Sequence, residues 1–180
     1  CGAMLWYPDE TIQHAGVITG LGGYAGHSHK YKKAGGSGYM FRTATVQDFS
    51  AVTGACLLVK TSVWDKVKGL DEAFAVAFND VDFCLRVRDA GYRIAWTPYA
   101  ELIHYESKSR GGDEKDPVKA ARFAAEQQRL YTIHGKENIL DDPYYNPNLT
   151  RDREDFSESD DLRRLKEGRV TVRFRGGTLQ

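Results

Sequence analysis

One short segment holds the side chains best suited to chemistry. Asn79 is a residue type that often begins a helix, which would place Asp80 in the first helical turn. The free N–H groups and the dipole of a helix N-terminus stabilise an ionised carboxylate there. An ionised Asp beside a loop predicts a general base that takes a proton from a hydroxyl nucleophile. The alternative is that an acidic residue in a first turn serves only to stabilise the helix.

A second carboxylate follows in the same segment. Asp82 lies four residues before Arg86, so the two side chains share one helix face and can pair. Asp80 and Asp82 together spell Asp-x-Asp. Because both lie where a helix begins, we do not interpret them as a metal-binding motif.

The composition limits the classes of function. The chain has 180 residues, the size of one domain, and its 41% hydrophobic content is ordinary for a globular protein. Lys plus Arg and Asp plus Glu number 25 each, which argues against a general electrostatic nucleic-acid binder. We find neither a run of 18 apolar residues nor a signal-peptide pattern.

The cysteines are three in number and far apart. Cys1, Cys56 and Cys84 include no Cys-x-x-Cys pair, which argues against a zinc site or a disulfide framework. Cys56 and Cys84 have apolar neighbours, as expected for small buried side chains. A reducing, cytoplasmic setting fits this pattern best.

Apolar strands alternate with helical patterns, which indicates an α/β fold. We expect strands at 3–7, 12–18, 52–60, 92–96 and 101–104, and helices at 61–67, about 79–90, and 117–134. The glycine-rich stretch 20–38 predicts a mobile loop, and Pro98 is expected to close a strand. Residues 151–169, rich in charges of both signs, predict a solvated helix or tail, and 170–174 an edge strand.

Several motifs in fixed order resemble the family-two glycosyltransferases. They read GACLL at 54–58, GLDE at 69–72, NDVDFCLR at 79–86 and AGYRI at 90–94, followed by His104. The chain is especially similar to the bacterial, rhamnosyltransferase-like branch that builds surface polysaccharides, as the segments DETIQHAG at 9–16 and DPYYNPNL at 142–149 also indicate. The resemblance covers residues 2 to about 157.

The resemblance implies roles for individual residues. Asp80 falls on the second acidic position of the family's pair and would be the base that deprotonates the acceptor hydroxyl. Asn79 replaces the usual Glu at the first position. With Gly54 and Ala55, whose small side chains would let the sugar approach, Asn79 and Asp82 complete the expected acceptor-binding set.

Metal and donor sites are also implied. His104 matches a histidine that helps to bind Mg²⁺ or Mn²⁺ in many enzymes of this fold, although a histidine after a strand is often only structural. The main carboxylate ligands of that metal are expected upstream of the chain. Ser107, Lys108, Ser109 and Arg110 would form a loop that closes on the donor pyrophosphate.

The implied fold is a partial GT-A, Rossmann-like fold: a mixed β-sheet flanked by helices, without the N-terminal nucleotide-binding half. Residues 1–150 would be the acceptor-side, catalytic portion, and 151–180 a charged C-terminal helix or tail. The implied activity is inverting transfer of a sugar from a nucleotide-sugar donor to a glycan or lipid-linked acceptor. We expect a cytoplasmic protein at the inner face of the membrane, and a fragment that is inactive alone and self-associates through exposed apolar surface.

Two other classes stay open from the residues alone. One is a non-catalytic module that binds carbohydrate or dimerises. The other is a metal-dependent hydrolase that uses Asp80, Asp82 and His104, which predicts hydrolysis by this chain with added metal.

Overall fold

The computed structural model of the chain describes residues 1–105, 116–159, 172–174 and 177–179. Its main sheet has the strand order β2-β1-β6-β5. These strands are β1 (Gly2–Trp6), β2 (Ile12–His14), β5 (Gln47–Asp48) and β6 (Ala95–Ile103). The β1 and β6 strands are parallel, whereas the β1–β2 and β5–β6 pairs are antiparallel, so the sheet is mixed.

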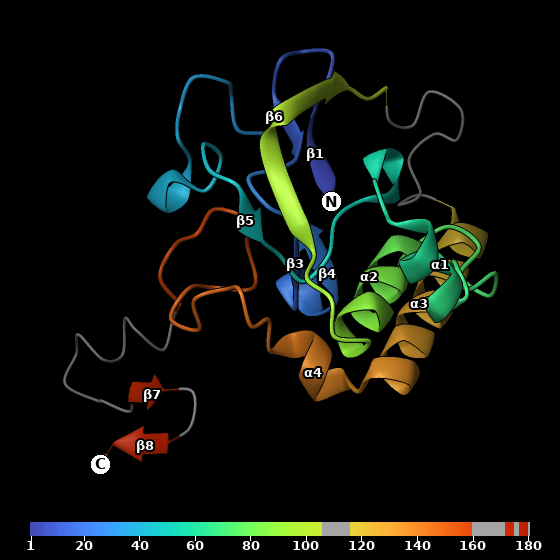
Figure 1. The fold of residues 1–180 in the computed structure, drawn as a ribbon. Helices are drawn as coiled ribbons and strands as arrows, with labels where there is room; N and C mark the ends of the chain where they lie inside the picture. The colour runs from blue at the N-terminus through green and yellow to red at the C-terminus, as the bar shows by residue number, and fades with distance from the viewer. Residues whose placement is uncertain (106–115, 160–171, 175–176, 180) are drawn as a thin grey trace.

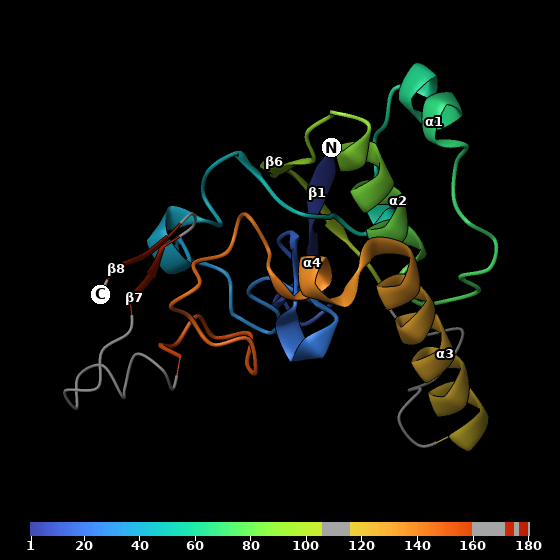
Figure 2. The ribbon, with the colours of Figure 1, turned by 90° about the horizontal axis from the view of Figure 1, so that it is seen from below.

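Three helices lie together on one side of β1 and β6 (Figures 1 and 2). They are α1 (Thr61–Val67), α2 (Asn79–Asp89) and α3 (Pro117–His134). The middle helix of this group, α2, contacts both α1 and α3. This mixed sheet flanked by helices confirms the predicted α/β fold class. None of the helices in the described ranges has the length and apolar character needed to cross a bilayer.

Smaller elements complete the described chain. They are β3 (Val17–Thr19), η1 (Leu21–Gly23), β4 (Ala25–His27), η2 (Tyr39–Phe41), η3 (Gly54–Cys56), α4 (Lys136–Leu140), β7 (Val172–Phe174) and β8 (Gly177–Leu179). The predicted strand at 170–174 corresponds to β7, which pairs with β8. The charged helix or tail predicted from Arg151 lies mostly outside the described residues, and 151–159 form turns and short extended stretches.

The strand predicted at 12–18 is split into β2 and β3. Gly16 lies between them with φ +94°, a left-handed conformation that favours glycine. A Cβ on Gly16 would come within 2.5 Å of the Phe49 ring. The chain therefore turns here and packs its backbone directly against the core.

The prediction that Pro98 closes a strand is wrong, because β6 continues through it. The register with β1 jumps from Ala3↔Thr97 to Met4↔Glu101, so Pro98 lies in a three-residue bulge. A proline has no N–H to give to a ladder, and a bulge does not require one. The two strands predicted at 92–96 and 101–104 are thus one bent strand.

The prediction of a buried strand at 52–60 is also wrong. Val52 is fully buried, but the chain then forms η3, and Leu58 is 77% exposed. Thr53 caps η3 by accepting a hydrogen bond from the N–H of Ala55 at 3.3 Å. An unbroken apolar run carries no alternation, so its pattern could not separate a core strand from a surface turn.

The stretch predicted as a loop at 20–38 contains regular structure. β3 and β4 form a hairpin that begins before this stretch and ends inside it. Ser28 and His29, which follow β4, are completely buried. Glycines here serve tight turns, such as Gly22 and Gly23 at positive φ, and do not exclude strands.

The helix predictions are confirmed. The Asp116 side chain caps α3 by accepting from the Val118 N–H at 2.9 Å, and Pro117 occupies the first turn as expected. Lys68 and Gly69, both at positive φ, end α1. The start of α2 differs from the prediction, because its cap is Phe78 and not Asn79.

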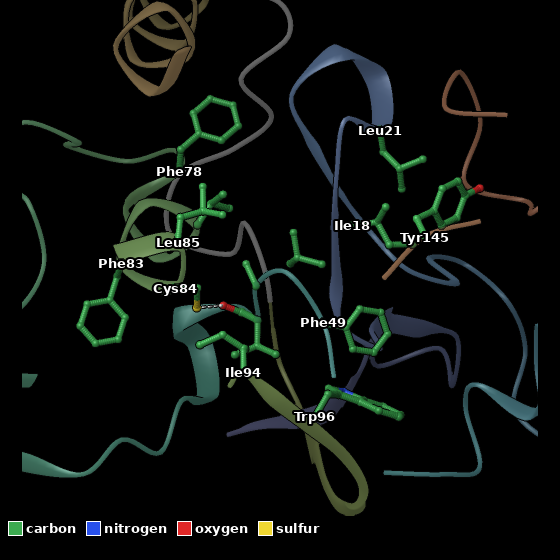
Figure 3. Close-up of a cluster of buried hydrophobic side chains, with 14 of the residues drawn as sticks. Ile18, Leu21, Phe49, Phe78, Phe83, Cys84, Leu85, Ile94, Trp96 and Tyr145 are labelled. Carbon is green, nitrogen blue, oxygen red and sulfur yellow. Dashed lines mark hydrogen bonds between the residues drawn. The ribbon is translucent and has the colours of Figure 1, made fainter. Parts of the chain in front are cut away.

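The core lies between the sheet and α2. Trp96 of β6 is fully buried; its ring meets Phe49 edge-on at 6.1 Å, and its Nε1 donates to the Ala3 carbonyl at 3.0 Å. Figure 3 shows this pair in the same buried cluster as Cys84 of α2. The Cys84 thiol donates to the Val52 carbonyl at 3.7 Å. Burial raises the pKa of Cys84 to about 12, so it is a buried thiol as predicted, whereas Cys56 is only partly buried.

Candidate functional site

Asp80 lies at the mouth of α2 with its side chain half-buried. Its Oδ2 accepts a hydrogen bond from the Gly54 N–H at 2.8 Å, and its Oδ1 accepts from the Val81 N–H at 2.9 Å. Each carboxylate oxygen has two lone pairs, so acceptor capacity is left on both. The two backbone donors fix the direction of the carboxylate and leave a lone pair on each oxygen.

The backbone just before Asp80 is strained. Phe78, the N-cap of α2, has φ 63° and ψ 2°, a left-handed conformation that is costly for a bulky residue. Its ring is held by Tyr24 at 5.6 Å and by Phe123 of α3 at 5.1 Å. These ring contacts offset the strain and fix the point at which α2 begins.

A buried carboxylate of α3 holds the loop that leads to this point. Glu126 accepts hydrogen bonds from the N–H groups of Val76 at 3.3 Å and Ala77 at 2.6 Å. Arg129, one helical turn later, pairs with Asp71 at the start of the loop at 2.6 Å. The mouth of α2 is therefore positioned by α3, about 50 residues further along the chain.

The small residues predicted to line an acceptor pocket lie beside this mouth. Gly54 is exposed, and a Cβ on it would lie 3.5 Å from the Cβ of Asp80. Ala55, also exposed, follows in η3. Asn79, in the first turn of α2, accepts the N–H of Asp80 on its Oδ1 at 2.7 Å. The structure thus places Gly54, Ala55 and Asn79 near Asp80, and their acceptor-binding role stays a prediction.

Asp82 has a different environment, deep in the protein. Its side chain is 1% exposed, and its Oδ2 accepts from Arg86 at 2.7 and 2.9 Å while Oδ1 contacts Nε2 of His134 at 2.8 Å. Burial alone would raise the pKa of Asp82, but hydrogen bonds from His134 and Arg86 outweigh it and lower that pKa. The predicted pairing with Arg86 is confirmed, and the acceptor-binding role of Asp82 stays a prediction.

The same network ties three helices together. Arg86 donates to the carbonyls of Val67 and Gly69 at the end of α1, at 2.5 and 2.8 Å. His134 ends α3. The hydrogen bonds of Asp82 and its partner Arg86 therefore join α1, α2 and α3. The i, i+4 spacing predicted the Asp82–Arg86 pair but not the contacts with α1 and α3.

His104 follows the end of β6 and is clamped by Gln13 of β2. The Gln13 amide donates to the His104 carbonyl at 3.2 Å, so its Oε1 is the atom 2.8 Å from the His104 Nδ1. That oxygen can only accept, and Nδ1 must carry the proton. His104 then has its lone pair on Nε2, the arrangement in which a histidine can bind a metal.

The environment of His104 fits the prediction that it is one metal ligand. The described residues hold no group of three or more metal-ligating side chains, so they do not supply the other ligands. Among the described residues, His104 forms hydrogen bonds with Trp6 of β1 and Gln13 of β2, and none is found with α2. The predicted donor-phosphate loop, Ser107, Lys108, Ser109 and Arg110, lies outside the described residues.

Sequence reasoning missed Gln13, Phe78, Glu126 and His134 as supporting residues. Gln13 could have been singled out from the sequence, because it lies in the segment 9–16 that carries part of the resemblance. Glu126 and His134 sit in a helix of moderate amphipathicity, where nothing local marks them as buried. The described arrangement can hold a hydroxyl beside a fixed carboxylate at a helix mouth, and that is the geometry a general base needs.

Comparisons with known proteins give several relatives of the chain. The chain is 51% identical over 156 residues to the uncharacterized protein y4gI of Sinorhizobium fredii, covering 86% of the chain and 17% of that relative. It is 35% identical over 150 residues to the O-antigen biosynthesis protein RfbC of Myxococcus xanthus, covering 83% of the chain and 11% of that relative. An N-acetylglucosaminyl-diphospho-decaprenol L-rhamnosyltransferase of Mycobacterium tuberculosis is 35% identical over 80 residues, 44% of the chain and 24% of that protein.

The chain thus spans about a sixth or less of the first two relatives. No family model matches it, and no solved structure shows significant similarity to it. The similarities relate the chain to glycosyltransferases and to polysaccharide synthesis, which confirms the resemblance at that level. Membership in family two and the GT-A type stay predictions.

Proposed function

We propose that the chain is the acceptor-side part of an inverting glycosyltransferase, in which Asp80 is the general base. The observation that carries the proposal is the half-buried carboxylate of Asp80 at the mouth of α2, held by the Gly54 N–H at 2.8 Å beside small, exposed residues. The sequence similarity to rhamnosyltransferases supports the same reading.

In the proposed reaction, the acceptor hydroxyl binds over Gly54 and Ala55 and loses its proton to Asp80. The oxygen then attacks the anomeric carbon from the side opposite the nucleoside diphosphate, so the configuration inverts. A divalent metal, with His104 as one ligand, would stabilise the charge on the departing diphosphate. By analogy with the named rhamnosyltransferase, we propose nucleotide-activated L-rhamnose as the donor to test first. The acceptor to test first is a diphosphate-linked lipid sugar.

The setting is also a proposal. All three cysteines are free, which fits a reducing cytoplasm, and a lipid-linked acceptor would bring the protein to the inner membrane surface. Exposed apolar side chains along the outer part of β6, namely Tyr99, Leu102 and Ile103, support self-association of the isolated chain.

The test is a transfer assay on the intact protein with labelled nucleotide sugars, lipid-linked acceptors and added Mg²⁺ or Mn²⁺. We expect transfer by the wild-type protein and none above background by the Asp80→Asn variant, which should still bind donor. Product NMR would report the configuration of the new bond. Glycan binding without transfer would favour the non-catalytic module, and release of free sugar without an acceptor would favour the hydrolase.

A further inference from the structure

The turn that holds Asp80 is itself held from the other side by two histidines. His14, the last residue of β2, is completely buried, and its Nδ1 lies 3.0 Å from the Nδ1 of His27 at the end of β4. The two rings meet edge-on, with centroids 5.0 Å apart. On its opposite side, the His14 ring receives the Thr53 N–H on Nε2 in a long hydrogen bond of 3.4 Å.

These contacts determine where the protons lie. A backbone N–H can only donate, so the His14 Nε2 must be unprotonated and its Nδ1 must carry the hydrogen. His27 accepts that hydrogen on its own Nδ1, which places the His27 proton on Nε2. Burial, and secondly the nearby His27, lower the pKa of His14 well below its usual value, so the neutral ring is the stable form.

The contacted amide is the neighbour of the one that binds Asp80. Thr53 donates its N–H to His14, and the next residue, Gly54, donates its N–H to the Asp80 carboxylate at 2.8 Å. Thr53 is extended, with φ −69° and ψ 143°, and its hydroxyl accepts from Ala55 at 3.3 Å. Only φ and ψ of Thr53 separate the two amides, so holding the Thr53 amide limits the directions that the Gly54 N–H can take.

We propose that His14, oriented by His27, is a positioning residue for Asp80: it holds the 53–54 turn so that the Gly54 N–H stays aimed at the carboxylate. This deepens the proposed function and rests on it for its catalytic consequence. The geometric part stands on the His27–His14–Thr53 and Gly54–Asp80 contacts alone. A phenyl ring would keep a flat ring at position 14 but would leave the half-buried Thr53 N–H without the acceptor that His14 provides.

The experiment compares His14→Phe with His14→Gln in the intact protein. Phe keeps a flat ring and loses the acceptor, whereas the Gln Oε1 can reach the position of Nε2 and accept the Thr53 N–H. We expect hydrogen exchange of the peptide containing Gly54 to become at least tenfold faster in His14→Phe and to return toward wild type in His14→Gln. We expect kcat to fall about 10- to 100-fold in His14→Phe, with the KM for donor unchanged, and to recover in part with Gln.

A second pair of variants approaches the same contact from the other end. Thr53→Pro removes the N–H while suiting φ −69°, and Thr53→Val removes only the hydroxyl. Hydrogen exchange at Gly54 should accelerate more in Thr53→Pro than in Thr53→Val. This second comparison tests the inference even if His14→Phe does not fold. Equal exchange at Gly54 in the wild-type, Phe and Gln proteins would overturn the inference. Absence of transfer by the wild type would sink the proposed function instead, because the exchange result does not depend on activity.

Discussion

Asp80 and Asp82 lie two residues apart on one helix, yet their surroundings are opposite. Asp80 is half-buried and, among the described residues, accepts hydrogen bonds from two backbone N–H groups, those of Gly54 and Val81. Asp82 is 1% exposed, and the side chains of Arg86 and His134 occupy both of its carboxylate oxygens. The first carboxylate is oriented but available, whereas the second is committed to joining three helices. The difference shows that position in the helix, and not residue type, decides which carboxylate can take part in chemistry.

The largest expected effect on stability comes from removing the buried carboxylate. Asp82→Ala leaves Arg86 and His134 without their partner, and breaking a buried pair typically costs 3–5 kcal/mol of unfolding free energy. Because Arg86 is partly exposed, we expect a loss of about 3 kcal/mol, measured by urea denaturation. Asp82→Asn, which keeps the shape and one acceptor, should lose less. A loss below about 1 kcal/mol for Asp82→Ala would contradict the comparison.

Substitution of the half-buried carboxylate, Asp80, should lower activity strongly and stability little. Asp80→Asn keeps the shape and can still accept the Gly54 N–H, but it cannot take a proton from a hydroxyl. General bases contribute about 10²- to 10⁴-fold, so kcat should fall at least about 100-fold. Unfolding free energy should fall by no more than about 1 kcal/mol, because the variant loses the negative charge at the helix N-terminus but keeps one acceptor oxygen. A variant that retained most of its turnover would move the base to another residue.

How far the sequence predicts these two environments depends on the distance along the chain. The α2 helix, its first-turn acid and the Asp82–Arg86 pair follow from spacings of up to four residues, and all three are confirmed. The partners that distinguish the two carboxylates come from 26 and 52 residues away, as Gly54 and His134. Only the folded chain brings them together, so local patterns could not predict them.

The errors in strand prediction have the same origin. The run at 52–60 is apolar without alternation, so its pattern does not show which residues are buried. Val52 is buried and η3 is exposed because Thr53 and Gly54 contact β2 and α2. The bulge at Pro98 depends on how β6 pairs with β1. The shortest glycine-rich elements, such as β4, gain their stability from pairing with β3 rather than from their own composition.

A buried histidine has a third kind of environment, different from those of the two carboxylates. Hydrogen bonds from His134 and Arg86 lower the pKa of Asp82, so Asp82 stays ionised, whereas His29 is completely buried and stays neutral. Burial, followed by the charges of Lys32 and Arg42, lowers the pKa of His29 to about 3. Its Nε2 accepts the Tyr39 N–H at 3.0 Å, which also requires an unprotonated nitrogen.

The expected pH dependence follows from that lowered pKa. The unfolded chain binds a proton at His29 near pH 6.5, but the folded chain does so only near pH 3. The contribution of His29 to stability is therefore complete above about pH 6.5 and is lost as the pH falls toward 3, by at most about 1.4 kcal/mol per pH unit. Exchange of the His29 ring C2 proton, followed by mass spectrometry, should titrate far below pH 6. A midpoint near 6.5 would show that His29 is not held neutral by the fold.

The smallest effect is expected at an exposed ion pair that otherwise resembles the buried one. Asp71 pairs with Arg129 at 2.6 Å, with side chains 28% and 43% exposed, and its pKa is lowered, first by the hydrogen bond from Arg129. Water and salt screen such a pair, so Asp71→Asn should cost only about 0.2–1 kcal/mol of unfolding free energy. Asn keeps the oxygen that accepts the Ala73 N–H at 2.9 Å, so the substitution removes the pairing with Arg129 and leaves the turn contact in place. Denaturation at low and high salt is the measurement: the loss should shrink in high salt, while that of Asp82→Ala should persist. A loss at Asp71 as large as that at Asp82 would mean that burial is not what separates the two pairs.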